Sequence, residues 1–172
     1  MKQAERRART HRALLDAATR CFARSGYSGT SLDHIAAEAQ LSRGGIYAHF
    51  PTKLALYLDV VAGTLARAED RLTFVAEALR QGAPPVVAAR RYITPPDAAH
   101  VALMADLWHT AVSEPLVRER LDHFRDLRLA RLGEACVDAG DAPGAALERA
   151  HATAAMIDAL ILDARLGRAV EA

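Results

Sequence analysis

The sequence has few aromatic residues and no long hydrophobic run, and each shortage excludes a class of protein. Aromatic residues make up 5% of the 172 residues although 51% are hydrophobic, so the core must consist mainly of alanine, leucine and valine. This balance favours helices, since strands are rich in β-branched and aromatic residues. No apolar run approaches the roughly 20 residues of a membrane helix, and the best candidate, residues 154–162, contains Asp158. We therefore expect an all-α protein without a membrane span.

Cysteine is also scarce. Cys21 and Cys136 lie far apart and form no CxxC pair, so we interpret them as reduced thiols, with a disulfide or redox switch as the alternative. The Arg-rich N-terminus lacks the apolar segment of a signal peptide, and a transit peptide is the less favoured interpretation. Together these features predict a cytoplasmic protein.

The net charge of +1 hides an uneven distribution of charge along the chain. Residues 1–53 carry nine basic and four acidic side chains, a net of +5, whereas the remainder carries 13 basic and 17 acidic side chains, a net of −4. A basic first third on a mildly acidic remainder is typical of a polyanion-binding head attached to a body of another function.

Apolar periodicity and breaks predict a chain of helices in two domains. A helix over residues 9–25 should end at Gly26, and Ser113 and Thr52 are expected to cap later helices. We expect further helices at about residues 31–39, 43–50, 53–82, 86–92, 97–112, 115–139 and 144–167. The predicted division is a three-helix first domain over residues 8–68 and a helical second domain over residues 69–172.

Residues 28–53 carry the most information about function. Thr30 or Ser31 can cap a short helix, and Ser42 can cap a second one after the break at residues 40–42. In that second helix Ile46 and Phe50 face inward, which turns Arg43, Tyr47 and His49 outward. A small helix with an exposed aromatic and two basic side chains is best explained as a recognition helix, in a helix-turn-helix over residues 31–50.

This region closely resembles the N-terminal domain of TetR-type transcriptional regulators over about 45 residues. The matching positions are Phe22, Gly26, Tyr27, Thr30, Ser31, Ile35, Ala36, Ala39, Ser42, Gly44, Tyr47, Phe50 and Lys53. Gln40 stands where glycine or asparagine is common in the turn, so a left-handed backbone is expected there at some strain.

The resemblance implies a set of DNA-binding residues. Phosphates are expected near Thr30, Tyr47, His49 and Lys53, and base edges near Arg43, Gly44 and Gly45, while Ser31 and Ser42 complete the set as helix caps. Arg43 suits guanine O6 and N7, and the glycines allow a close backbone approach.

The resemblance also implies a homodimeric, ligand-responsive repressor that binds an inverted-repeat operator in double-stranded DNA. We expect dimerisation through the last two helices, since one short recognition helix reads too few base pairs alone. The Ala-rich face proposed for this contact comprises Ala150, Ala154, Met156, Ile157 and Leu160.

A small-molecule effector pocket is expected in the second domain. Phe74, His100, Met104 and Trp108 are candidates for its lining, with an ordinary core stripe as the alternative, and an apolar or amphipathic ligand is the natural occupant. Asp106 and His109 lack an evident third metal ligand, so we interpret them as a surface pair and expect neither a metal nor a cofactor.

Two other classes of function compete with a regulator. An enzyme is disfavoured, because neither a nucleophilic triad nor a phosphate-binding glycine loop is present in the sequence. A helical protein–protein interaction module with a degenerate DNA-binding head is the stronger alternative.

Overall fold

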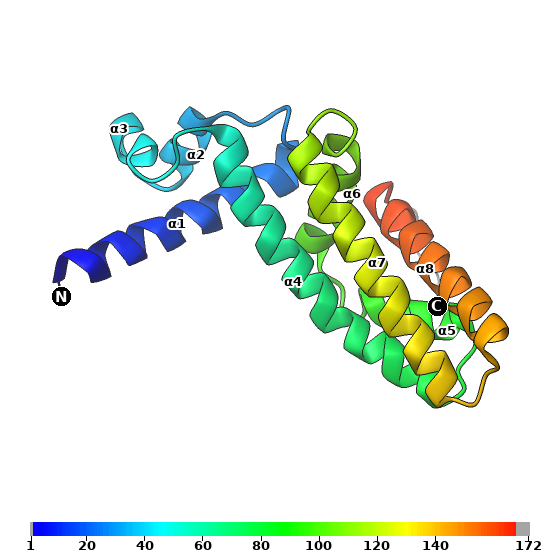
Figure 1. Cartoon of the computed structure of the whole chain (residues 1–172). Coiled ribbons are helices and arrows are strands. Elements are labelled where there is room, and N and C mark those ends of the chain that lie inside the picture. The colour runs from blue at the N-terminus through cyan, green and yellow to red at the C-terminus, as the bar shows by residue number, and fades with distance from the viewer. Residues whose placement is uncertain (1, 168–172) are drawn as a thin grey trace. The chain divides into compact units, whose positions relative to one another are not determined.

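The computed structural model describes residues 2–167, and every regular element in that range is a helix (Figure 1). The chain divides into two compact units, residues 1–63 and residues 64–172. This confirms the predicted all-α class. The division falls on the same long helix as the predicted boundary after residue 68, which as a functional boundary stays a prediction.

The first unit consists of α1 (Lys2–Ser25), α2 (Leu32–Glu38), α3 (Arg43–Tyr47) and the beginning of α4 (Lys53–Arg80). Leu14, Phe22, Ile35 and Ile46 are fully buried and form its core. The end of α1 is set by Gly26, whose φ of 69° lies in the left-handed region that glycine adopts without steric cost.

The turn between α2 and α3 is fixed by helix caps at both sides. Ser31 accepts a hydrogen bond from the N–H of His34, and Ser42 accepts one from the N–H of Gly45, each at 3.2 Å. Between them Gln40 adopts a φ of 56°, and the N–H of Leu41 donates to the carbonyl of Ala36 at 2.9 Å. The predicted caps and the predicted left-handed residue are therefore confirmed.

The second unit contains the rest of α4 together with α5 (Pro85–Arg90), the 3₁₀ helix η1 (Arg91–Ile93), α6 (Ala98–Thr110), α7 (Pro115–Asp138) and α8 (Pro143–Arg165). Helix α8 packs against α5, α6 and α7 (Figure 1). The Arg128 guanidinium reaches the Asp158 carboxylate from α7 with two bonds of 2.6 and 3.1 Å, which fixes α7 against α8.

Three details differ from the sequence-based expectation or extend it. Helix α1 begins at Lys2 rather than residue 9, because its first turns are built of good helix formers that carry no apolar stripe. Thr52 accepts from the N–H of Ala55 at 3.1 Å, as predicted. Ser113 is not the cap of α7: Glu114 holds that position, and the Ser113 hydroxyl donates to the Thr110 carbonyl instead.

The expected dimer face is wrong in its residues. Ala150, Ala154 and Ile157 are at most 5% exposed and belong to the core of this chain, while Met156 is 37% exposed. The apolar periodicity of these residues marks the buried side of α8 rather than its outer side. Large apolar side chains that do remain exposed on α7, on α8 and at the end of α8 include Leu116, Val137, Leu147, Leu162 and Leu166.

Both cysteines are buried and carry free thiols, Cys21 in α1 and Cys136 in α7. Burial raises the pKa of each thiol. No helix in the described range is long and apolar enough to cross a membrane.

Candidate nucleic-acid interface

A shallow hollow of about 350 Å³ lies beside α3, and we call it the α3 hollow. Its lining residues are Thr30, Ser31, Leu32, Asp33, Arg43, Tyr47 and Lys53. Five of the nine predicted DNA-binding residues therefore meet in one place. They come from three segments: the turn before α2, helix α3 and the first residue of α4.

Arg43 and Tyr47 are the exposed side chains of α3 in this hollow. Tyr47 is 44% exposed, and its phenol group can donate to an external acceptor. The Arg43 Nε lies 3.2 Å from an Asp33 carboxylate oxygen, and both side chains are more than half exposed. An exposed pair of this kind contributes about 0–1 kcal/mol, so Arg43 can leave Asp33 for a base edge or a phosphate.

Lys53 has a structural role that the sequence did not reveal. Its ammonium donates to the carbonyls of Tyr27 and Thr30 at 2.8 and 3.0 Å, and it lies 4.3 Å from the centre of the Tyr27 ring. An ammonium has three donors, so one remains for an external phosphate. Lys53 therefore ties the start of α4 to the turn that leads into α2.

Thr30 is placed differently from the expectation. It is 4% exposed, and its hydroxyl donates to the Gly26 carbonyl at 2.8 Å with the Cys21 carbonyl within 3.3 Å. The last carbonyls of a helix lack intrahelical donors, so the hydroxyl completes the end of α1. Ser31, which is exposed, is the hydroxyl that remains available at this edge of the hollow.

The two glycines of α3 are not required by packing. A Cβ atom on Gly44 would meet nothing within 4 Å, and one on Gly45 would lie in ordinary contact, 3.4 Å from the Ser42 Oγ. Gly44 therefore faces open space, where its lack of a side chain leaves room for a closely approaching partner.

His49 lies outside the α3 hollow, against α1. The His11 ring stacks on Phe50 with 4.9 Å between ring centres, and the His11 and His49 centres are 6.0 Å apart. Burial, followed by the charges of Arg7 and His11, lowers the pKa of His49. Neither His11 nor Arg7 was expected at the interface, since both precede the helix-turn-helix by 20 residues or more in sequence.

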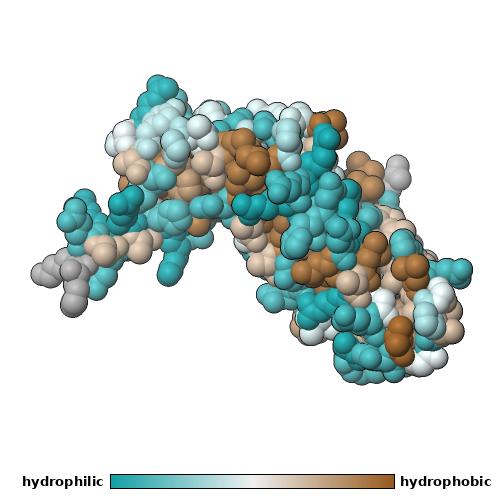
Figure 2. Space-filling view, in the orientation of Figure 1, coloured by the Kyte–Doolittle hydropathy of each residue, from teal (hydrophilic) through white to brown (hydrophobic). Residues whose placement is uncertain are grey.

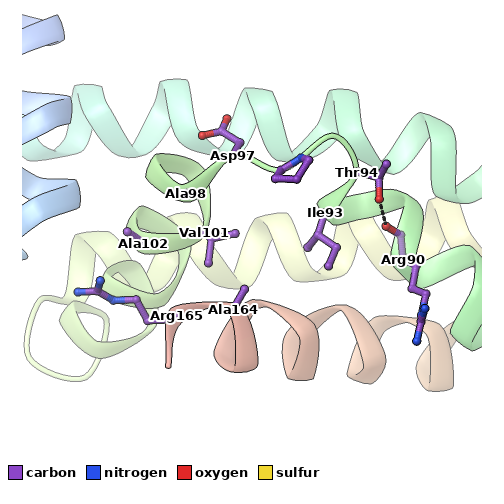
Figure 3. Close-up of a pocket in the computed structure, with 10 residues that line it drawn as sticks. Arg90, Ile93, Thr94, Asp97, Ala98, Val101, Ala102, Ala164 and Arg165 are labelled. Carbon is purple, nitrogen blue, oxygen red and sulfur yellow. Dashed lines mark hydrogen bonds between the residues drawn. The ribbon is translucent and has the colours of Figure 1, made fainter. Parts of the chain in front are cut away.

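A separate cavity of about 580 Å³ lies within the second unit (Figure 3). Figure 3 shows Ile93 and Val101 facing Ala164 at its centre, with Arg90 and Arg165 at its two ends. Thr94, Pro96, Asp97, Ala98 and Ala102 complete the lining. The cavity thus combines an apolar middle with guanidinium groups at its ends.

None of the four residues predicted for an effector pocket lines this cavity. Phe74 is 61% exposed, Trp108 is half-buried, and His100 and Met104 are buried in the core. The Tyr92 hydroxyl lies 3.2 Å from His100 Nε2, and burial lowers the pKa of His100 to about 4. Helical periodicity marked the buried stripe of α6, whereas the cavity is formed by its first turn and by η1 and α8.

Among residues 2–167, no group of three histidine, cysteine or acidic side chains is arranged to hold a metal ion. Asp106 and His109 therefore have no third ligand within the described residues.

Comparison with known proteins connects this geometry to a family. Residues 14–60 match the family model described as bacterial regulatory proteins, tetR family. AcrR of Shigella flexneri, an HTH-type transcriptional regulator, is 42% identical over 59 residues, which are 34% of this chain and 26% of AcrR. The chain thus spans at most about a quarter of the length of the curated relatives it matches.

Solved structures match nearly the whole chain at low identity. A putative transcriptional regulator of Saccharomonospora viridis in complex with choline has a TM-score of 0.79 at 23% identity, covering 95% of this chain and 88% of that one. AibR in complex with isovaleryl coenzyme A and operator DNA has a TM-score of 0.62 at 22% identity, covering 92% and 96%. At these identities the likeness shows a common fold.

Proposed function

The protein is a member of the TetR family of transcriptional regulators, and we propose that it acts as a homodimeric repressor that a small molecule releases from its operator. The observation that carries this proposal is the α3 hollow. There Ser31, Arg43 and Tyr47 present hydrogen-bonding groups beside the short helix that follows the helix-turn-helix bend. Phosphate contacts fix the register of such a helix, and contacts to base edges read the sequence.

Each side chain has a distinct task in this proposal. The Arg43 guanidinium exchanges Asp33 for a guanine, reading O6 and N7 with two bonds. Tyr47 and Ser31 donate their hydroxyls to phosphates, and Lys53 adds its third ammonium donor while it holds the turn at residues 27–30. The backbone at Gly44 approaches the DNA closely because no side chain intervenes.

Selection of duplexes from a random library tests this function. The wild-type protein should enrich an inverted repeat, and Arg43→Ala should relax the preference at one position of each half-site. Tyr47→Phe removes a single neutral hydroxyl and should weaken all sequences alike without changing the salt dependence, because the lost group carries no charge. Failure of a folded wild-type dimer to enrich any sequence would favour the interaction module with a degenerate head.

Dimerisation is proposed through the outer face of α8 together with α7. Ala155, Ala159, Leu162 and Leu166 recur at helical spacing and are all exposed, and the small alanines permit close approach of a second helix. Two heads held one helical turn apart, about 34 Å, would read the two halves of an inverted repeat.

The cavity between η1, α6 and α8 is the proposed effector site. Its apolar centre and terminal arginines suit a small amphipathic molecule that carries an acidic group. On the far side of η1 and α6, Arg71 of α4 donates to the carbonyls of Tyr92 and Pro95 and pairs with Asp97 at 3.4 Å. Because Arg71 and Lys53 belong to one continuous helix, a shift of residues 92–97 on binding would act on α4.

A matched set of eight-carbon probes tests the effector proposal. Octanoate should bind, as measured by isothermal titration calorimetry, and release operator DNA, whereas octylammonium should do neither. Arg165→Gln should weaken octanoate binding. Equal responses to the acid and the amine would contradict the proposed charge preference, and binding without DNA release would contradict the regulatory role of the cavity.

A further inference from the structure

Two further hollows border the α3 segment on the side of α1, and we call them the α1 hollows. One, of about 430 Å³, is lined by Gln3, Arg6, Arg7, Thr10, Ala48 and His49. The other, of about 630 Å³, is lined by Ala4, Arg7, Ala8, His11, Arg12, Leu15 and His49. Arg7 and His49 belong to both. None of these residues lines the α3 hollow, so the segment around α3 is bordered by two separate surfaces.

The placement of His49 joins α1 to the end of the α3 segment. The stacking of His11 on Phe50, with the His11 and His49 ring centres 6.0 Å apart, places residues 49 and 50 against α1. The 3.8 Å approach of His11 Nε2 to the Asp59 carboxylate joins the same part of α1 to α4. Consecutive helical residues point about 100° apart. Tyr47 therefore lines the α3 hollow, whereas the next residue, Ala48, lines one of the α1 hollows.

The α1 hollows are cationic and contain no acidic lining residue. Within the described range Arg6, Arg7 and Arg12 form neither an ion pair nor a hydrogen bond through their guanidinium groups. Arg9, which lines neither hollow, likewise has no ion pair among the described residues, whereas the later arginines of the same unit are paired: Arg20 and Arg24 contact Glu38, and Arg43 contacts Asp33.

The local field has the same sign. Burial lowers the pKa of His49, and the charges of Arg7 and His11 lower it further. The carboxylate of Asp59 lies against His11. Figure 2 shows this part of α1 as a largely hydrophilic surface. An external anion would complete the cluster.

We propose that the α1 hollows bind the phosphodiester backbone of the second DNA strand, opposite the strand held at the α3 hollow. The major groove is about 12 Å wide and is bordered by two backbones, so a helix inserted in it has phosphates on both sides. Arg6 and Arg7 supply charge-assisted hydrogen bonds to these phosphates, and His49 donates a ring N–H. This inference rests on the proposed DNA-binding function and extends the interface from the motif to the first two turns of α1.

A matched pair of arginine variants tests the inference. Arg7 lines both hollows, whereas Arg9 is an exposed arginine of the same helix that lines neither. Arg7→Ala should weaken binding to the selected operator and to a shuffled duplex by the same factor, about tenfold, and reduce the salt slope by about 0.9 per head. Arg9→Ala should leave the slope unchanged.

Ethylation interference identifies the individual operator phosphates that the protein contacts, which a general change in protein charge does not alter. In the wild type, modification of one phosphate per half-site near the α1 hollows should interfere with binding, and this position alone should become silent in Arg7→Ala. Tyr47→Phe should silence a phosphate on the other strand. Circular dichroism confirms that the variants fold.

The outcomes separate this inference from the function on which it rests. Equal slopes and equal interference patterns for Arg7→Ala and Arg9→Ala, with normal operator binding by the wild type, would overturn the second-strand site alone. Loss of operator binding in the wild type itself would overturn the proposed function and the inference together.

Discussion

Gln40 holds a backbone conformation that is costly for any residue with a side chain. Its φ of 56° ends α2, and the bond from the Leu41 N–H to the Ala36 carbonyl depends on that geometry. Gln40→Gly should raise the free energy of unfolding by up to about 1 kcal/mol, since glycine adopts this conformation without a Cβ clash. Urea unfolding measures the change. Gln40→Val should shift the midpoint the other way, and a stabilised valine variant would contradict this reasoning.

His100 makes stability depend on pH in one direction. The buried ring has no partner for Nδ1 within the described residues, and burial lowers its pKa from 6.5 to about 4. A lowered pKa means that the unfolded chain binds the proton first. The neutral ring therefore contributes up to about 3 kcal/mol to the free energy of unfolding. This contribution is complete above pH 6.5 and is lost as the pH falls toward 4.

Urea midpoints between pH 7.5 and 4 measure this loss. His100→Leu combined with Tyr92→Phe removes the ring and its hydroxyl partner together, so neither is left unpaired. The double variant should lose less stability over that range than the wild type. Parallel pH profiles for the two proteins would exclude His100 as the cause.

At the scale of elements, α3 is the shortest helix of the first unit. It has five residues, two of them glycine, and depends on the Ser42 cap and on the buried Ile46 for its stability. Glycine destabilises a helix by about 1 kcal/mol relative to alanine. Nothing in the described part of the protein packs at Gly44. The proposed close approach of DNA would account for a glycine there despite this penalty.

Gly44→Ala tests that explanation. The added Cβ meets no protein atom, so the free energy of unfolding should stay equal or rise by up to about 1 kcal/mol. Operator affinity should nevertheless fall by about tenfold or more, the equivalent of roughly 1.4 kcal/mol. Fluorescence anisotropy with labelled operator measures it, and Gly133→Ala, also facing open space but in α7, is the control. Unchanged affinity in Gly44→Ala would remove the case for close approach.

The elements were predictable where the signal is local and not where it depends on contacts distant in sequence. The caps Ser31 and Ser42 and the turn at Gln40 follow from bonds within a few residues. The bonds of Lys53 to the Tyr27 and Thr30 carbonyls span more than 20 residues, and no periodicity encodes them. Apolar spacing predicts where the helices lie and which of their faces are buried, but it does not distinguish a packed core from a cavity wall. His100 and Met104 belong to the buried face of α6 and do not line the cavity, so their prediction as pocket residues is wrong.

At the scale of the whole molecule, the proposed function depends on the pairing of two chains. Leu162 is 48% exposed on the outer face of α8, and Leu162→Glu places a charge in the proposed dimer interface. Sedimentation velocity should show a shift from dimer to monomer, and affinity for the inverted repeat should fall by roughly a hundredfold or more as the avidity of two linked heads is lost.

Phe74→Glu is the control for this prediction, because Phe74 is 61% exposed on α4, outside the proposed interface. That variant should remain dimeric. Equal dissociation of both variants would contradict an interface specific to α8. A dimer that persists in Leu162→Glu would contradict it as well.

Each unit contains one buried cysteine that can serve as a probe of its local opening. Cys21 lies in the first unit and Cys136 in the second, and both thiols are shielded and weakly ionised in the folded chain. Because only an exposed thiolate reacts with an alkylating reagent, the rate of labelling at each position reports the local opening of its unit. Mass spectrometry of the two labelled peptides would thus reveal whether operator DNA slows local opening in the first unit alone, seen as slower labelling of Cys21, or in the second unit as well, seen as slower labelling of Cys136.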